Sequence, residues 1–276
     1  LGGVGGGAPA AAETAAETLG EVAAIPLSEI HAGMRGYGLS VFRGTVPERF
    51  DVEVLGVLEN NRAGGSYILA RLAGQGLDKS GVIAGMSGSP VYFDGRLAGA
   101  VAFSWPFAKE PIAGITPIEA MRSIPDRARL AGPAPTPAPH PTGSPALALA
   151  EIGARQVPAD FLDATLARFA SAVSNEGRSS LLWGATGFGE ATRTRLANLL
   201  PASASSLAAL GGGEDPKIAA DLVAGGSVAA VYIDGDLRLA ATGTVTDLAG
   251  DRLLAFGHSA VGIGAISMPL ATSEVI

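Results

Sequence analysis

Ser87 lies in a loop of small residues, 85–90 (GMSGSP), between two segments with β-strand character. A serine flanked by glycines suits a nucleophile, because a tight turn exposes the hydroxyl and directs main-chain N–H groups toward a substrate carbonyl. The N–H groups of Gly85 and Ser87 are the candidate oxyanion hole, and glycine at position 85 tolerates the backbone angles that this requires. An ordinary Gly/Ser hairpin loop explains the pattern equally well on sequence statistics alone.

His258 is the candidate general base, since it follows the apolar segment Leu253–Phe256 and a glycine and would project from a strand end into a cleft. A lone histidine is more often a structural residue than a functional one. His31 precedes the first expected strand and is interpreted as part of a structural turn. His140 lies among prolines and is interpreted as solvated linker.

The composition excludes several other kinds of chemistry. The chain has no cysteine, so a cysteine nucleophile, a thiolate metal site and a disulfide are excluded. Three histidines make a multi-histidine metal site hard to assemble. The net charge of −7 gives no basic face for a nucleic acid. Glycine and proline interrupt every apolar run before it reaches the ~20 residues of a membrane span. We therefore expect no cofactor, no metal, no nucleic-acid partner and no transmembrane segment.

A glycine-rich segment, 184–189 (GATGFG), precedes an expected helix and suggests a phosphate-binding loop. It lacks the lysine and the serine or threonine of a P-loop, and its glycine spacing does not fit the dinucleotide fingerprint. A strand-to-helix turn is sufficient to explain it.

The elements that must position Ser87 and His258 form two β-rich regions. The expected organisation is a flexible lead-in (1–24), a β-barrel half that carries the serine (25–130), a proline-rich linker (131–145), a helical or mixed connecting region (146–225) and the start of a second β-barrel half that carries the histidine (226–276). Strands are expected at 39–42, 52–57, 67–72, 90–93, 98–103, 227–233, 238–245 and 253–256, and amphipathic helices at 159–172 and 190–200. The chain begins without methionine or a secretory leader, which suggests a fragment or a mature form.

Residues 81–121 (GVIAGMSGSPVYFDGRLAGAVAFSWPFAKEPIAGITPIEAM) resemble the nucleophile segment of the SpoIVB peptidases, serine proteases of bacterial sporulation signalling. Residues 243–258 are similar to the hairpin of that family that ends in Leu-Gly-His-Gly and presents the histidine. The resemblance implies a mainly β, chymotrypsin-like double β-barrel with the site in the cleft between the barrels, here with a proline-rich linker and a small helical insert. Sporulation-type members carry the histidine segment first, so the order in this chain is permuted.

The third member of a triad stays unassigned. The family places an aspartate about fifteen residues before the nucleophile, where this chain has apolar residues around Leu72. Asp78 is expected in a solvent-facing turn, and turn chemistry accounts for Asp247 and Asp251. The acid could also lie beyond Ile276, or the enzyme could work as a Ser–His dyad.

The sequence thus predicts a serine endopeptidase that acts through an acyl-enzyme, with Ser87 as nucleophile, His258 as base and a protein or peptide as substrate. Self-cleavage is left open. Tyr92, Trp105 and Phe107 are candidates for a specificity pocket, although barrel core is the simpler role. The resemblance implies a bacterial protein that is secreted or in the cell envelope. The alternatives are an inactive barrel that serves as a protein-binding module of the envelope, and a serine esterase.

Overall fold

The computed structural model describes residues 22–61, 65–104, 110–124, 182–199, 208–209, 221–250, 252–259 and 268–275. The expected helix at 159–172, the proline-rich linker with His140, and Trp105, Phe107 and Asp251 lie outside the described residues. The elements of the first half are η1 (Leu27–Glu29), β1 (Arg35–Ser40), β2 (Glu48–Asn61), β3 (Gly65–Ala73), α1 (Leu77–Ser80), β4 (Pro90–Phe93), β5 (Arg96–Ser104), β6 (Ile112–Pro117) and α2 (Ile118–Arg122). Those of the second half are β7 (Leu182–Thr186), α6 (Glu190–Leu199), β8 (Ala208–Ala209), β9 (Ser227–Ile233), β10 (Arg238–Ala249), β11 (Arg252–Ala255) and β12 (Leu270–Thr272).

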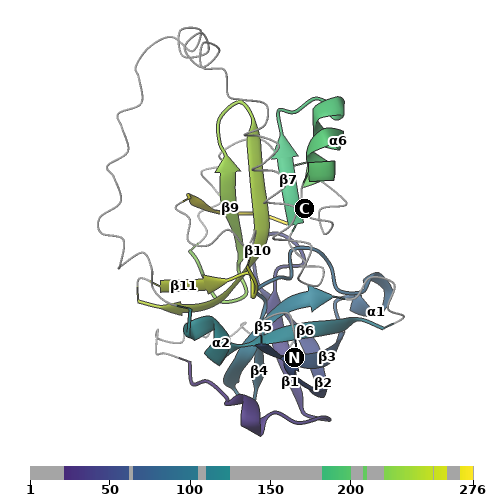
Figure 1. The fold of residues 1–276 in the computed structure, drawn as a ribbon, viewed down its shortest axis with the longest axis vertical. Coiled ribbons are helices and arrows are strands. Elements are labelled where there is room, and N and C mark those ends of the chain that lie inside the picture. The colour runs from purple at the N-terminus through teal and green to yellow at the C-terminus, as the bar shows by residue number, and fades with distance from the viewer. Residues whose placement is uncertain are drawn as a thin grey trace, which may run out of the picture.

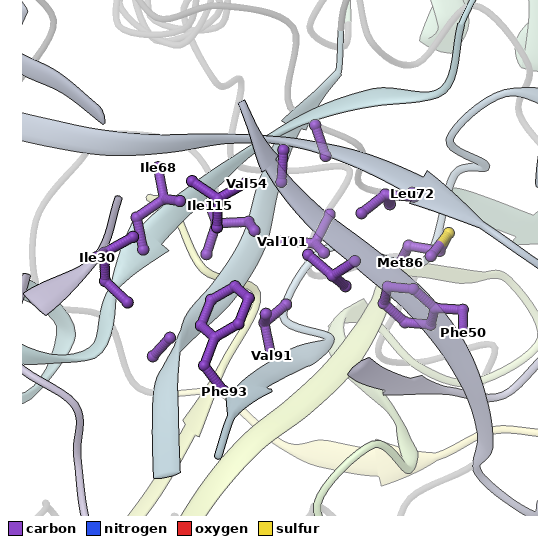
Figure 2. Packing of buried hydrophobic residues seen from close by; sticks show 14 of the residues in the cluster. Ile30, Phe50, Val54, Ile68, Leu72, Met86, Val91, Phe93, Val101 and Ile115 are labelled. Carbon is purple, nitrogen blue, oxygen red and sulfur yellow. The ribbon is translucent and has the colours of Figure 1, made fainter. Parts of the chain in front are cut away.

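Strands β1 to β6 form a closed antiparallel barrel in the order β1-β2-β3-β6-β5-β4 (Figure 1). The long strand β2 changes register between Val54 and Gly56, and such a bulge bends a strand as barrel closure requires. Apolar side chains from the barrel strands fill its interior, where Figure 2 shows Phe50, Val54, Ile68, Val101 and Ile115 among others. Closure pairs every strand on both edges. It gives a rigid base to the loop of residues 85–90, which carries the candidate nucleophile Ser87 and is called the nucleophile loop below.

The second β-rich unit is a sheet in the order β12-β9-β10-β7-β8, with β11 paired to β10. In the described part of this sheet, neighbouring strands are antiparallel except β7 and β8, which are parallel. Helix α6 lies where the sequence predicts a helix, directly after β7. The buried cluster of this sheet comes from β7 and β10, which present apolar side chains to the same layer: Trp183, Ala185, Leu239 and Ala241.

The predicted mainly β fold is confirmed, and the closed barrel with few helices is consistent with a chymotrypsin-like double barrel. The second sheet takes strands β7 and β8 from the range predicted as helical or mixed, in addition to those after residue 226. Strand β6 was not among the predicted strands, because its six residues carry no period-2 alternation of apolar and polar side chains. No helix in the described part of the chain is long and apolar enough to cross a membrane.

Several contacts join the two units in the described part of the chain. Arg122 of α2 forms an ion pair with Asp247 of β10, with Nη2 and Oδ2 2.7 Å apart. Gly44, between β1 and β2, exchanges main-chain hydrogen bonds with Val275, near the end of the chain. Further contacts, among them those of β10 with the loop that carries Ser87, are described with the site. Residues far apart in the sequence therefore hold the barrel and the sheet together.

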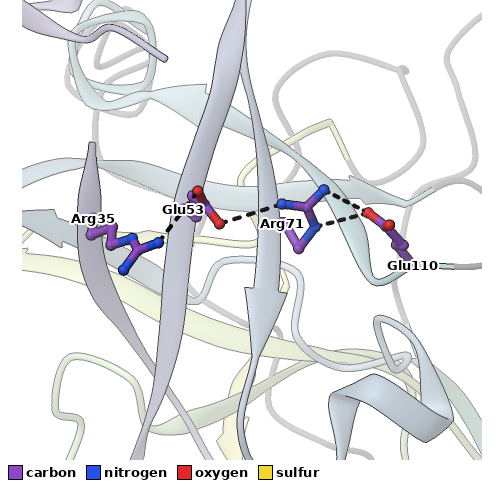
Figure 3. Close-up of polar contacts among 4 residues, drawn as sticks. All are labelled: Arg35, Glu53, Arg71 and Glu110. Carbon is purple, nitrogen blue, oxygen red and sulfur yellow. Dashed lines mark hydrogen bonds and ion pairs between the residues drawn. The ribbon is translucent and has the colours of Figure 1, made fainter. Parts of the chain in front are cut away.

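A row of alternating charges crosses the outer face of the barrel (Figure 3). Arg35, Glu53 and Arg71 are directly opposed on β1, β2 and β3, and Glu110 extends the row before β6. The N–O distances are 3.8, 3.3 and 2.7 Å along the row, and each side chain is at least one-third exposed. Opposed charges of this kind favour the strand register but contribute little to stability each, because water screens them.

Candidate active site

The structure brings the two residues singled out from the sequence into contact. Ser87 Oγ and His258 Nε2 are 2.8 Å apart although 171 residues separate them. Ser87 lies between α1 and β4 of the barrel, and His258 follows β11 of the second sheet. The contact therefore spans the boundary between the two units. A hydroxyl and an imidazole nitrogen at this distance have the arrangement of a nucleophile and its base.

Neighbouring strands hold the nucleophile loop by its main chain. The N–H of Gly88 donates to Val101 O at 2.7 Å, and the N–H of Val101 donates to Ser89 O at 3.0 Å. Gly85 has φ of +98°, in the region that favours glycine, so the sequence argument for glycine at this position agrees with the backbone. Ser87 itself is fully buried. The loop is packed protein interior and differs in this from an ordinary surface hairpin.

Tight packing against the second sheet explains a second glycine of the loop. At Gly88 a Cβ would overlap the carbonyl oxygen of Thr244 and the amide nitrogen of Phe256. Gly243 fits in the same way against the Phe256 ring and the Ser87 carbonyl. Glycine occurs at positions 88 and 243 because the nucleophile loop and β10 approach each other too closely for a side chain at either position.

A distorted chain segment carries His258 away from β11. Phe256 has φ of +66°, which is unusual for a residue with a side chain, and Gly257 follows with φ of +71°. These two residues turn the chain at the strand end, so that the imidazole points toward the barrel instead of continuing the sheet. Strain of this kind costs of order 1–3 kcal/mol and persists where surrounding packing holds it, as the Phe256 ring does against Gly243.

The hydrogen bonds of the imidazole fix its tautomer. His258 Nδ1 lies 2.8 Å from the carbonyl oxygen of Ser259, which can only accept a hydrogen bond. Nδ1 therefore carries the proton, and Nε2 presents its lone pair to the Ser87 hydroxyl. Desolvation lowers the pKa of His258 to about 4, even though the hydrogen bond to Ser259 acts in the opposite direction. The ring is neutral near pH 7, as a base must be.

An aromatic group flanks the imidazole on the barrel side. The ring of Phe103 lies 5.8 Å from the ring of His258, centroid to centroid, and Tyr67 contacts Phe103 edge-on at 5.0 Å. Apolar neighbours disfavour the charged imidazolium, which agrees with the direction of the pKa shift. Of the three candidates for a specificity pocket, only Tyr92 lies within the described residues. It stacks on Tyr37 and is nearly buried in the barrel wall.

The acidic candidates take other roles where the structure describes them. Asp247 was attributed to a turn, and that interpretation is wrong, because it lies within β10, is 5% exposed and forms the ion pair with Arg122. The sequence could not reveal this, since its partner is 125 residues away. Asp78 is exposed on α1. Within the described ranges, the Nδ1 partner of His258 is a main-chain carbonyl and not a carboxylate.

Two buried threonines of β10 were not recognised from the sequence. Thr244 Oγ1 donates to Gly85 O at 2.8 Å, and Thr246 Oγ1 donates to Gly88 O at 2.7 Å. The signal was their alternation in Thr-Val-Thr just before the histidine hairpin, which places both hydroxyls on one face of a strand. His31, by contrast, is exposed and bonds to the neighbouring Ala32 carbonyl. Among the described residues, no group of three His, Asp or Glu side chains could hold a metal ion.

Comparison with known proteins finds a family similarity in the first part of the chain. Residues 4–121 match the family model described as SpoIVB peptidase S55. The match includes the Ser87 loop and ends before β7, so it does not extend to His258. Searches of curated proteins and of solved structures gave no significant match. The resemblance predicted from residues 81–121 is thus confirmed: residues 4–121 of this chain are similar to the SpoIVB peptidase family of serine peptidases.

Proposed function

We propose that the chain is a serine endopeptidase that forms an acyl-enzyme on Ser87 with His258 as general base. The observation that carries the proposal is the 2.8 Å contact between Ser87 Oγ and His258 Nε2. Two residues from different units rarely meet in this way by chance, and the contact involves the serine of a peptidase-family region. The similarity of residues 4–121 to that family supports a protein or peptide as the substrate.

The first chemical step follows from the tautomer. With the proton on Nδ1, Nε2 accepts the Ser87 hydroxyl proton while Oγ forms a bond to the carbonyl carbon of the scissile peptide. The π electrons of the carbonyl move to its oxygen and create a tetrahedral oxyanion. In our proposal, the N–H groups of Gly85 and Ser87 donate to that oxygen, and one such donor contributes about 3–4 kcal/mol in the transition state.

The second step releases the amine. The imidazolium returns its proton from Nε2 to the peptide nitrogen, the carbon–nitrogen bond breaks, and an ester remains on Ser87 Oγ. Water then repeats the sequence, with its proton passing to Nε2 and then to Oγ as the ester breaks. Protons and electron pairs balance over the cycle, and the product is a carboxylic acid and an amine.

The proposed site works as a dyad that a main-chain carbonyl orients. The carbonyl of Ser259 holds the ring in the tautomer that a triad aspartate would select. A neutral carbonyl stabilises the imidazolium less than a carboxylate does. We therefore expect slow turnover, because replacing a triad aspartate has cost as much as ~10⁴ in kcat elsewhere.

Access to the site is a second expected cause of slow turnover. Ser87 has no exposed surface in this structure, so a substrate carbonyl reaches Oγ only when neighbouring groups move. We infer that peptide binding includes such a displacement, as in enzymes whose sites open before the chemical step. The family assignment further supports action outside the cytoplasm, in the envelope or in the medium.

A fluorophosphonate probe tests the nucleophile directly. We expect wild-type protein to label and Ser87→Ala to show no labelling, while His258→Gln labels at least ~100-fold more slowly, as loss of a general base predicts. Ser80→Ala is the control, since Ser80 is exposed on α1, its hydroxyl donates to the carbonyls of Gly76 and Gly81, and the variant is expected to label as wild type does.

The other functions predict different outcomes. No labelling of the folded full-length chain would overturn the proposal and favour an inactive binding module. Labelling together with turnover of small esters, but without cleavage of unfolded casein detected by mass spectrometry, would favour an esterase.

A further inference from the structure

We infer that Thr244 is a positioning residue for the oxyanion hole, and that β10 thereby controls the reactivity of the barrel's nucleophile loop. The inference rests on the proposed function and deepens it by assigning a role to a residue that touches neither the substrate nor the reacting atoms. Thr244 is 2% exposed and belongs to the second unit, whereas the loop belongs to the barrel.

The geometry of the loop explains why one hydroxyl matters. The two proposed donors, the N–H groups of Gly85 and Ser87, lie on either side of the peptide that joins Gly85 to Met86. The carbonyl of that peptide accepts from Thr244 Oγ1 at 2.8 Å, and its N–H donates to Ile83 O at 3.3 Å. The orientation of this middle peptide sets the angle between the two donors. Thr244 fixes that orientation through its hydrogen bond to the Gly85 carbonyl.

Glycine at position 85 makes an external restraint necessary. A glycine populates positive and negative φ about equally, so the loop gains little from its own sequence to select φ of +98°. A rotated peptide would direct a carbonyl oxygen, and not an N–H, toward the developing oxyanion. The buried Thr244 hydrogen bond disfavours that rotation, because the Gly85 carbonyl would lose its partner.

The same strand holds the loop at two further points. The Thr244 N–H donates to the carbonyl of Ser87 at 2.7 Å, and Thr246 Oγ1 donates to the carbonyl of Gly88 at 2.7 Å. Thr244 and Thr246 face the loop because alternate residues of a strand share a face, while Val245 bonds to Gly225 and Gly226 on the other side. These main-chain and side-chain bonds keep β10 in place when the Thr244 hydroxyl alone is removed.

Thr244→Val tests the inference, since valine keeps the shape and removes the hydroxyl. We expect kcat for a small ester to fall about 10- to 100-fold with KM within 3-fold, because a misplaced donor weakens transition-state binding only. Thr244→Ser restores the donor and is expected to stay within about 3-fold of wild type. Thr242→Val is the matched control, since Thr242 lies on the same strand, is 7% exposed and pairs with Ala229 of β9 instead of the loop.

A titration of active sites separates positioning from folding. Saturating fluorophosphonate labels the fraction of molecules with an intact site, so kcat per labelled site falls in Thr244→Val if the loop is misplaced. A purely structural role would lower the labelled fraction and leave kcat per site unchanged, which would overturn the inference. An active wild type with Thr244→Val equal to Thr242→Val would overturn it as well, while the proposed function would stand. Absence of labelling in wild type and Thr244→Ser alike would instead reject the proposed function, and this inference with it.

Discussion

His258 lies in an irregular segment after β11, yet its imidazole ring is desolvated. It follows a short strand and two residues with positive φ, yet its imidazole lies between the barrel residue Phe103 and the Ser87 hydroxyl. Desolvation by these neighbours lowers its pKa to about 4. A base of low pKa is fully available at neutral pH but draws a proton weakly, so availability and basicity work against each other at this site.

The acid limb of the pH–rate profile reports this pKa. We expect kcat/KM for an ester, or the second-order rate of fluorophosphonate labelling, to stay constant from pH 7 downward and fall with a midpoint near 4. Circular dichroism at each pH serves as the control for folding. A midpoint near 6.5, the ordinary value for histidine, would show that the ring is solvated when the enzyme reacts.

The free energy of unfolding also depends on the pKa of His258, and it falls as the pH falls. Between pH 6.5 and about 4 the unfolded state binds the proton and the folded state does not, so acidification across this window lowers the free energy of unfolding. The His258→Gln variant lacks this contribution, and its urea midpoint is expected to change less over the window.

At the scale of elements, the nucleophile loop and β10 pack closely because glycines take the place of larger residues at their contact. Gly88 and Gly243 leave room for two main chains that approach each other, and Thr244 and Thr246 supply the hydrogen bonds across the contact. The irregular loop cannot form a regular ladder of main-chain hydrogen bonds, so the threonine hydroxyls of β10 satisfy its carbonyls instead. The loop is therefore ordered by tertiary contacts more than by its local sequence.

Gly88→Ala tests this contact against a matched glycine. Gly88 and Gly95 both have positive φ, of +96° and +73°, but only Gly88 has main-chain atoms where a Cβ would lie. We expect Gly95→Ala to lower the free energy of unfolding by about 1–2 kcal/mol. Gly88→Ala is expected to cost about 3 kcal/mol or more, because the overlap with β10 adds to the backbone strain. Urea denaturation and fluorophosphonate labelling measure the two effects, and equal stability of the two variants would mean that the loop and β10 can separate freely.

At the scale of the whole molecule, the proposed activity depends on how the barrel and the second sheet join. One unit supplies Ser87, the other supplies His258, and the buried Arg122–Asp247 pair links α2 to β10 near that boundary. Leu254 of β11 packs against the cluster that includes Ile118 of α2, so the histidine hairpin also rests on the barrel through apolar contacts. A change at this junction is expected to affect the site without touching it.

Asp247→Asn measures the contribution of the junction. We expect it to lower the free energy of unfolding by about 2 kcal/mol, since it leaves Arg122 largely buried without its charged partner. Glu29→Gln is the control, because Glu29 and Arg96 are also 2.7 Å apart but more exposed, and its effect is expected to be under about 1 kcal/mol.

The double variant Arg122→Met/Asp247→Leu distinguishes a charge effect from a packing effect. It is expected to be more stable than Asp247→Asn, since it leaves no unpaired buried charge. Equal losses for Asp247→Asn and Glu29→Gln in urea denaturation would show that the pair does not hold the junction.

The extent of sequence prediction differs between elements for physical reasons. Strands such as β4 and β9 were predicted at their observed bounds, because β-branched and aromatic residues end at glycine, aspartate or proline turns. Strand β6 was missed, since most of its six residues are buried and its sequence shows no alternation of apolar and polar residues. Asp247 was misassigned because its buried partner is distant in sequence, and no local pattern reports a contact of that kind.

The sequence by itself determined the family region, the mainly β composition and the two residues that could do chemistry, because glycine, proline and a lone serine or histidine in a loop leave local signatures. Only the tertiary structure decided that Ser87 and His258 meet, that a carbonyl of Ser259 orients the ring, and that Thr244 holds the loop. Each of these depends on which main-chain and side-chain atoms come within hydrogen-bonding distance when two units pack, and that is a property of the folded chain.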